Sequence, residues 1–173
     1  MEIKDSGERR QFESGAVRDI QKGKGRCDLM PLDIIAHLYD GNKDIYGVFS
    51  RLEQFKRTGD PIYLRLAFEI YIRQCGKGMS DQLLDVALQF EDGAVKYGEN
   101  NWQKGIPVNC YIDSATRHYL KVLRGDTDEP HSRAFMWNLL CCMWTCENMP
   151  ELNTYKKEDI NEGNTNSADR ETD

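Results

Sequence analysis

EDGAVKYGENNW at residues 91–102 opens the stretch that decides the fold, which continues through DSATRH (113–118) and GDTDEPH (125–131) to WN (137–138). Two of the three histidines, several carboxylates and an asparagine recur there at helical spacings, within segments apolar enough to form a core. Ionisable groups on buried faces are costly unless they are paired or bound to a metal. This stretch is therefore a candidate functional site as well as a candidate core.

The spacing of apolar residues around this stretch predicts an all-α fold, a helical bundle of about six helices. Proline and N-capping residues begin several of the helices, and glycines end most of them. The last helix is apolar on every side between Ala134 and Trp144 except at Asn138, so we expect it to be the central, most buried element. The predicted helices cover residues 32 to about 39, 44 to about 56, 61–75, 80 to about 97, 109–124 and 128 to beyond 144.

The chain has 173 residues, which suits one domain with a proper core. We expect a flexible polar arm at residues 1–14, a single all-α domain at 15–149 and a disordered polar tail at 150–173.

The charge and hydropathy of the chain exclude two classes of partner. A net charge of −6 argues against non-specific nucleic-acid binding, which needs a basic surface. No apolar run approaches membrane-spanning length, and the N-terminus does not resemble a signal peptide. The six cysteines lack CxxC spacing, so we interpret them as reduced core thiols of a cytoplasmic protein, although a Cys/His zinc site stays open.

The fourth predicted helix places a carboxylate within its apolar stripe. Leu84, Leu88 and Val95 follow helical spacing, and Glu91 lies among them. Glu91 is either a metal ligand or base, or a carboxylate at the edge of the core. Lys96 lies four residues after Asp92, so it is either a cation for a ligand or a partner of that carboxylate.

The fifth and sixth helices carry the two histidines. His118 shares a surface with Ala115 and Val122, where a core histidine and a catalytic one are both open. Asp113 stands four residues before Arg117 and can pair with it. His131 and Asn138 lie two turns apart on one face, and a buried asparagine must be hydrogen-bonded. Asn138 is therefore either a structural bridge or a site residue.

Two loops carry candidate substrate-binding residues. Lys24 and Arg26 alternate with glycines, which allows backbone amides and cations to approach a phosphate. The same segment reads equally well as a solvated loop, because it lacks the Walker spacing. In the second loop Asn101 precedes Trp102, which either stacks on a base or closes the loop over the core.

The combination of these segments resembles a known family. GKGRCDLMP at 23–31, the 91–102 and 113–118 segments, DEPH at 128–131 and WN at 137–138 look like the dATP/dGTP diphosphohydrolase N-terminal-domain family. This family is common in bacteriophage genomes and loosely grouped with the all-α MazG-like pyrophosphohydrolases. The resemblance covers residues 15–38 and 90–147, and the helices at about 44–75 look like an insertion.

The resemblance implies a nucleotide site but departs from the MazG pattern. The EExxE and ExxD motifs that give MazG-type enzymes an all-carboxylate Mg²⁺ site are absent. A mixed set of carboxylates, imidazoles and an amide takes their place, which shifts the preference from Mg²⁺ towards Mn²⁺, Co²⁺ or Zn²⁺.

We therefore expect a homo-oligomeric, metal-dependent enzyme that converts a purine dNTP to the monophosphate and pyrophosphate, in the host cytoplasm if a phage encodes it. A divalent ion would polarise the phosphoryl oxygen and lower the pKa of the attacking water. The expected metal ligands are Glu91, Glu129 and His131, and the expected catalytic residues are His118 and Asp113. The expected substrate-binding residues are Lys24, Arg26, Lys96, Asn101, Trp102, Arg117 and Asn138.

Two other functions remain open from the sequence. The first is a non-catalytic protein that binds and sequesters a nucleotide or nucleotide-derived signal, using the same cations and aromatic residue. The second is a small structural or interaction protein whose histidines and asparagine are polar bridges in the core.

Overall fold

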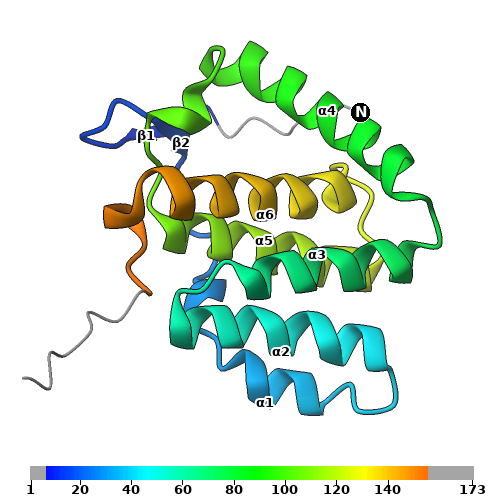
Figure 1. Ribbon diagram of the computed structural model, residues 1–173. Helices are drawn as coiled ribbons and strands as arrows, with labels where there is room; N and C mark the ends of the chain where they lie inside the picture. The colour runs from blue at the N-terminus through cyan, green and yellow to red at the C-terminus, as the bar shows by residue number, and fades with distance from the viewer. Residues whose placement is uncertain (1–6, 156–173) are drawn as a thin grey trace, which may run out of the picture.

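The six expected helices are present in the computed structural model, which describes residues 7–155 (Figure 1). A two-stranded hairpin and three short 3₁₀ segments accompany them. The helices are α1 (Leu32–His37), α2 (Lys43–Thr58), α3 (Ile62–Cys75), α4 (Met79–Tyr97), α5 (Val108–Arg124) and α6 (His131–Asn148). The remaining elements are β1 (Arg9–Gln11), β2 (Val17–Asp19), η1 (Cys27–Leu29), η2 (Asn101–Lys104) and η3 (Pro150–Leu152).

Helix α6 is the central element, as its all-round apolar sequence predicted. It lies between α4 on one side and α5 and α3 on the other (Figure 1). The Phe135 side chain is fully buried and packs against Tyr71 and Tyr119, with ring centroids 4.7 and 5.1 Å apart. Helices α1 and α2 continue the stack beyond α3. None of the helices within residues 7–155 is long and apolar enough to cross a membrane.

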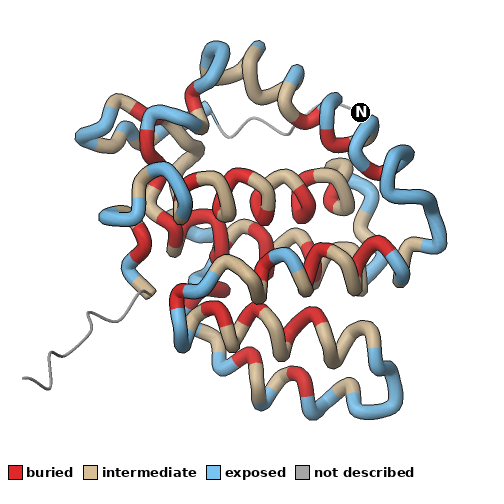
Figure 2. The backbone as a smooth tube through the Cα atoms, in the orientation of Figure 1, coloured by how far each residue is buried: buried red, intermediate tan, exposed pale blue. Residues whose placement is uncertain are grey.

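Helix α4 presents the opposite face from the one its sequence predicted. Leu84, Leu88 and Val95, expected to point inward, are 70, 47 and 86% exposed, whereas Gln82, Val86 and Gln89 are buried. Figure 2 shows both exposed and buried stretches along α4. The reason lies on α6, where Arg133 is paired with Asp92 and donates a hydrogen bond to Gln89. Because a guanidinium in a side chain that is only 11% exposed needs such polar partners, α4 turns Gln89 and Asp92 towards α6, together with the apolar Val86. The expected inward position of Glu91 is also wrong, since it follows the exposed stripe.

The β1–β2 hairpin occupies a region expected to be loosely structured. Its antiparallel register pairs Arg9 with Asp19 and Gln11 with Val17. Gly15, with a positive φ of 82°, forms the turn. The hairpin is held by Asn101, whose side chain accepts from Val17 N at 2.9 Å and donates to Val17 O at 2.8 Å. Such short strands depend on a distant partner, so local patterning did not predict them.

The segment after α6 also packs against the domain. Asn153 donates to the Gly59 carbonyl at 2.8 Å, and the Tyr155 ring lies edge-on to Phe55. Residues 150–155 are therefore ordered by contacts that the expected disordered tail did not include. Residues 1–6 and 156–173, the rest of the expected arm and tail, lie outside the described residues.

The aromatic cluster around α6 gives a first prediction. Phe135→Ala should lower the free energy of unfolding by about 3–5 kcal/mol, because it removes a fully buried ring and leaves a cavity. Urea unfolding followed by circular dichroism measures the loss. The control Leu38→Ala, at a position 78% exposed, should change stability by less than about 0.5 kcal/mol. Equal effects at the two positions would contradict the central place of α6.

Candidate metal and nucleotide site

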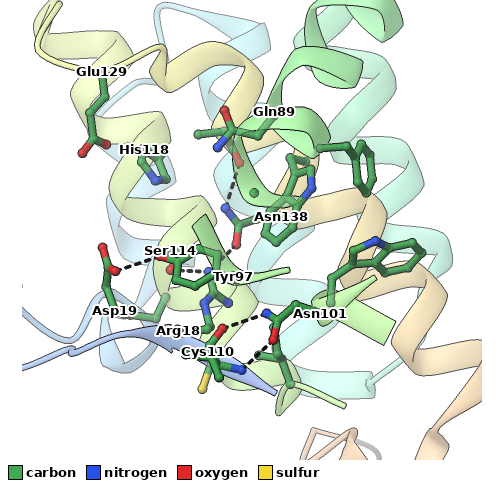
Figure 3. Close-up of a pocket in the computed structure, with 18 of the residues that line it drawn as sticks. Arg18, Asp19, Gln89, Tyr97, Asn101, Cys110, Ser114, His118, Glu129 and Asn138 are labelled. Carbon is green, nitrogen blue, oxygen red and sulfur yellow. Dashed lines mark hydrogen bonds between the residues drawn. The ribbon is translucent and has the colours of Figure 1, made fainter. Parts of the chain in front are cut away.

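A cavity of about 740 Å³ lies between the hairpin, α4, α5 and the first half of α6 (Figure 3). This volume falls within the range of pockets that bind cofactors and nucleotides. Strand β2 contributes Arg18 and Asp19, and the loop after α4 contributes Asn101 and Trp102. In the view of Figure 3, Glu129 and His118 lie on one side of Arg18 and Asn101 on the other.

Three side chains form a hydrogen-bonded chain at the His118 end of the cavity. The Nδ1 atoms of His118 and His131 lie 3.0 Å apart, and His131 Nε2 lies 2.8 Å from Asp128 Oδ1. Burial, followed by the neighbouring His131 and Arg117, lowers the pKa of His118 to about 3. The hydrogen bond from His131 lowers the pKa of Asp128 to about 2. His118 is therefore neutral and Asp128 ionised near neutral pH.

Glu129 joins this chain to make a group suited to a metal. Ligand atoms of His118, Glu129 and His131 all lie within 4.8 Å of one another, and Glu129 Oε2 is 3.9 Å from His131 Nδ1. The expected ligands Glu129 and His131 thus lie together with His118, which was expected to be catalytic. Asp126, Asp128 and His131 form a second group whose ligand atoms also lie within 4.8 Å of one another. We call this the outer group and the His118–Glu129–His131 group the inner one.

The types of ligand atom in this group bear on which metal it would hold. Two imidazoles with one carboxylate suit Mn²⁺, Fe²⁺ or Co²⁺ better than Mg²⁺, which prefers oxygen ligands.

Glu91 does not join either metal group of the described residues. It is exposed on α4 and lines the cavity, but its carboxylate lies outside both groups. Its sequence neighbour Asp92 pairs with Arg133, and Lys96 pairs with Asp19 at 3.0 Å, so these two do not pair with each other as the sequence allowed. The apolar stripe that singled out Glu91 is the face that α4 turns to solvent.

Asp113, expected to be catalytic, anchors the N-terminal loop. Its Oδ1 accepts a hydrogen bond from Cys27 N at 2.7 Å, and its Oδ2 accepts from Gln21 and Arg117. Arg117 in turn donates to the carbonyls of Lys24 and Gly25 at 3.0 and 3.2 Å. With both oxygens engaged, Asp113 is poorly placed to take a proton from water.

The expected phosphate-binding cations divide into two sets. Lys24 and Arg117 line the cavity. Arg26 and Lys96 do not: Arg26 pairs with Asp28 at 2.5 Å, while Lys96 pairs with Asp19. Burial raises the pKa of Asp19, but hydrogen bonds from Tyr97 and Lys96 outweigh it and leave that pKa below its ordinary value. Lys121, which sequence analysis did not single out, lines the cavity one turn after His118.

The remaining expected substrate residues have partners within the protein. Asn138 is buried, donates to the Ala134 carbonyl at 2.8 Å and accepts from Arg18 at 3.0 Å. Arg18 also donates to Ser114 at 3.1 Å and lies over the Tyr111 ring. Arg18 was missed because it lies on the hairpin, whose sequence showed no strand pattern.

Asn101 and Trp102 form the opposite end of the cavity. Asn101 is buried and bound to Val17 of the hairpin, while Trp102 packs edge-on against Phe90 and Trp144 at centroid distances of 5.5 and 5.0 Å. Trp102 therefore closes the loop over the core and also lines the cavity, so the two readings of this residue are compatible.

The family comparison covers the half of the chain that carries most of this site. A family model described as "dATP/dGTP diphosphohydrolase, N-terminal" matches residues 68–155, just over half of the chain. The chain belongs to this family. The match runs from α3 to the end of the described residues and includes the diphosphohydrolase-family segments at 91–102, 113–118 and 125–138. No curated protein and no solved structure matches the chain.

The position of Asp113 gives a second prediction. Asp113→Ala should lower the free energy of unfolding by about 1–3 kcal/mol, because the buried Cys27 amide loses its acceptor. Hydrogen exchange at the Cys27 amide should accelerate in the same variant. The control Asp40→Ala removes an exposed carboxylate and should leave both unchanged. Unchanged stability with a specific loss of nucleotide turnover would instead restore Asp113 to the catalytic role expected from sequence.

Proposed function

We propose that the cavity binds a purine deoxynucleoside triphosphate and that the protein hydrolyses it to the monophosphate and pyrophosphate. Water would attack the α-phosphorus, and the bond from that phosphorus to the oxygen bridging the β-phosphate would break. The observation that carries the proposal is the His118–Glu129–His131 group at the end of a nucleotide-sized cavity, in a chain of the diphosphohydrolase family.

His118, Glu129 and His131 would hold a divalent ion, which when bound supplies a polarised phosphoryl oxygen and a water of lowered pKa. These three residues alone would leave part of the ion's coordination shell for phosphate and water. Neutral His118 is suited to this role, because an imidazolium cannot ligate a metal.

The charge of the cavity supports metal dependence. Among described residues, its lining carries five basic side chains and six carboxylates. A triphosphate carrying several negative charges would be repelled by this balance unless a cation accompanied it. Lys24, Arg117 and Lys121, which line the cavity, are our proposed phosphate contacts. Arg26 and Lys96 do not line the cavity and do not enter the proposal.

The aromatic wall is the proposed contact for the base. Phe90, Trp102 and Trp137 line the cavity. The Phe90 ring packs edge to face against Trp102 and against Trp137, with centroid distances of 5.5 and 5.9 Å. A purine has more ring surface to place against such a wall than a pyrimidine.

We propose that the reaction takes place in the cytoplasm, which for a phage-encoded protein is that of the host cell.

A nucleotide panel tests this function. The wild-type protein should release pyrophosphate from dATP or dGTP with Mn²⁺ or Co²⁺, and chelation should abolish turnover. Glu129→Gln should reduce turnover at least about 100-fold through loss of a ligand. The control Glu147→Gln alters an exposed carboxylate outside the cavity and should leave turnover unchanged.

Two outcomes would redirect the proposal. Tight nucleotide binding without turnover under any metal would support the sequestering function instead. A loss in Glu91→Gln equal to that in Glu129→Gln would place Glu91 in the ligand set, as the sequence alone suggested.

We further propose that the protein is a homo-oligomer whose subunits meet through α4. This helix exposes Leu83, Leu84 and Leu88, whereas a surface helix in a monomer usually presents polar residues to solvent. Exposed apolar stripes of this kind mark interfaces. A second copy of the chain would cover both stripes at once, because each copy presents the same apolar surface.

Replacing both Leu84 and Leu88 by serine should convert the oligomer to a monomer, because it removes the centre of the stripe. Light scattering coupled to size exclusion measures the mass directly. The control Leu38→Ser removes a leucine that is 78% exposed, directly after α1, and should leave the mass unchanged. A wild-type protein that is already monomeric at high concentration would refute the proposal.

A further inference from the structure

The hydrogen bond between Asp128 and His131 determines where the protons of the histidine pair lie. An ionised carboxylate only accepts hydrogen bonds, so the proton between Asp128 Oδ1 and His131 Nε2 belongs to the histidine. A neutral imidazole with its proton on Nε2 has its lone pair on Nδ1. That atom is 3.0 Å from His118 Nδ1, on the side where Glu129 lies.

With His131 neutral, the neighbouring histidine holds the opposite tautomer in the metal-free protein. Two Nδ1 atoms 3.0 Å apart share one proton, and because His131 Nδ1 is the acceptor, His118 Nδ1 is the donor. Metal binding between them would require His118 to give up its Nδ1 proton and take one from solvent on Nε2, with no net change in protonation. His131 would need no change, since its lone pair already faces the inner group.

The two possible metal groups around His131 therefore differ chemically. The outer group of Asp126, Asp128 and His131 would need the Nε2 lone pair, which the proton facing Asp128 occupies. Its carboxylates also have cationic partners: Asp126 is paired with Arg124, and Asp128 lies 3.5 Å from Lys121. Glu129 of the inner group has no lysine or arginine ion-pair partner among residues 7–155. The inner carboxylate is also the less exposed, at 17% against 40% for Asp128.

We propose that Asp128 is a positioning residue that fixes the tautomer of His131 and so directs a divalent ion to the inner His118–Glu129–His131 group. Carboxylates that orient metal-binding histidines in this way recur in metalloproteins. The inference rests on the proposed metal site and goes beyond it, because it gives Asp128 a role without contact with metal or nucleotide. Sequence spacing offered a signal for it, since Asp128 precedes His131 by three residues.

The test compares metal binding by three full-length proteins, using Mn²⁺ alone in calorimetry. Asp128→Asn should weaken Mn²⁺ binding about 10- to 100-fold, because an amide presents both a donor and an acceptor and no longer selects one tautomer. Asp126→Asn is the matched control from the outer group and should bind Mn²⁺ within about threefold of wild type. Asp128→Glu should recover part of the lost affinity. Thermal melts in the absence of metal confirm that each variant is folded.

Nitrogen-15 spectra of the histidine rings supply a readout that a merely structural role would not move. Metal-free wild type should show His131 protonated on Nε2 and His118 on Nδ1, and Asp128→Asn should show His131 as a mixture of tautomers. Addition of diamagnetic Zn²⁺ to wild type should shift His131 Nδ1 and leave its Nε2 protonated.

Three results would overturn the inference. A Zn²⁺-dependent shift at His131 Nε2, or an equal loss of Mn²⁺ affinity in Asp126→Asn, would place the ion in the outer group. Unchanged affinity and tautomer in Asp128→Asn would remove the positioning role. If wild type bound no divalent ion, the proposed metal site itself would fail, and the metal-free tautomers would still show whether Asp128 orients His131.

Discussion

The burial of α6 on every side is the constraint on which the rest of the structure depends. A helix without a solvent face must be covered by neighbours in all directions, and α3, α4 and α5 supply that cover. Three polar side chains of α6 then find partners on other elements. His131 meets His118 of α5, Arg133 meets Asp92 of α4, and Asn138 meets Arg18 of the hairpin.

These hydrogen bonds and ion pairs determine where the cavity forms. Arg133 holds the polar face of α4 against α6, and Asn101, in the loop that follows α4, holds the hairpin through Val17. The hairpin brings Arg18 and Asp19 to the cavity wall, from a part of the chain about 80 to 120 residues away from their partners. Asp113 and Arg117 of α5 then hold the loop that contains Lys24 and Cys27 through hydrogen bonds to its backbone. The site is therefore assembled by side-chain hydrogen bonds between distant segments more than by secondary structure.

Several residues that the sequence indicated as site candidates make hydrogen bonds that hold segments of the protein together. Asp113, Asn101 and Asn138 have the polarity and burial expected of site residues, yet each is committed to backbone or side-chain partners within the protein. Burial of a polar group indicates that a partner exists, and the sequence does not say whether that partner is protein, metal or substrate. His118, Glu129 and His131 differ because one ligand atom of each lies within 4.8 Å of the others.

The sequence by itself determined the all-α class, the position of each long helix, the central place of α6 and the family. Those features follow from local periodicity, capping residues and short motifs, which neighbouring residues in the chain express. Only the tertiary structure decided which face α4 turns inward, that the N-terminal segment forms a hairpin, and that His118 joins Glu129 and His131 while Glu91 does not. These outcomes depend on pairings such as Arg133 with Asp92 and Asn101 with Val17, whose partners lie 41 and 84 residues apart. No local pattern encodes such pairs, because the energy that selects them arises when the helices have already packed.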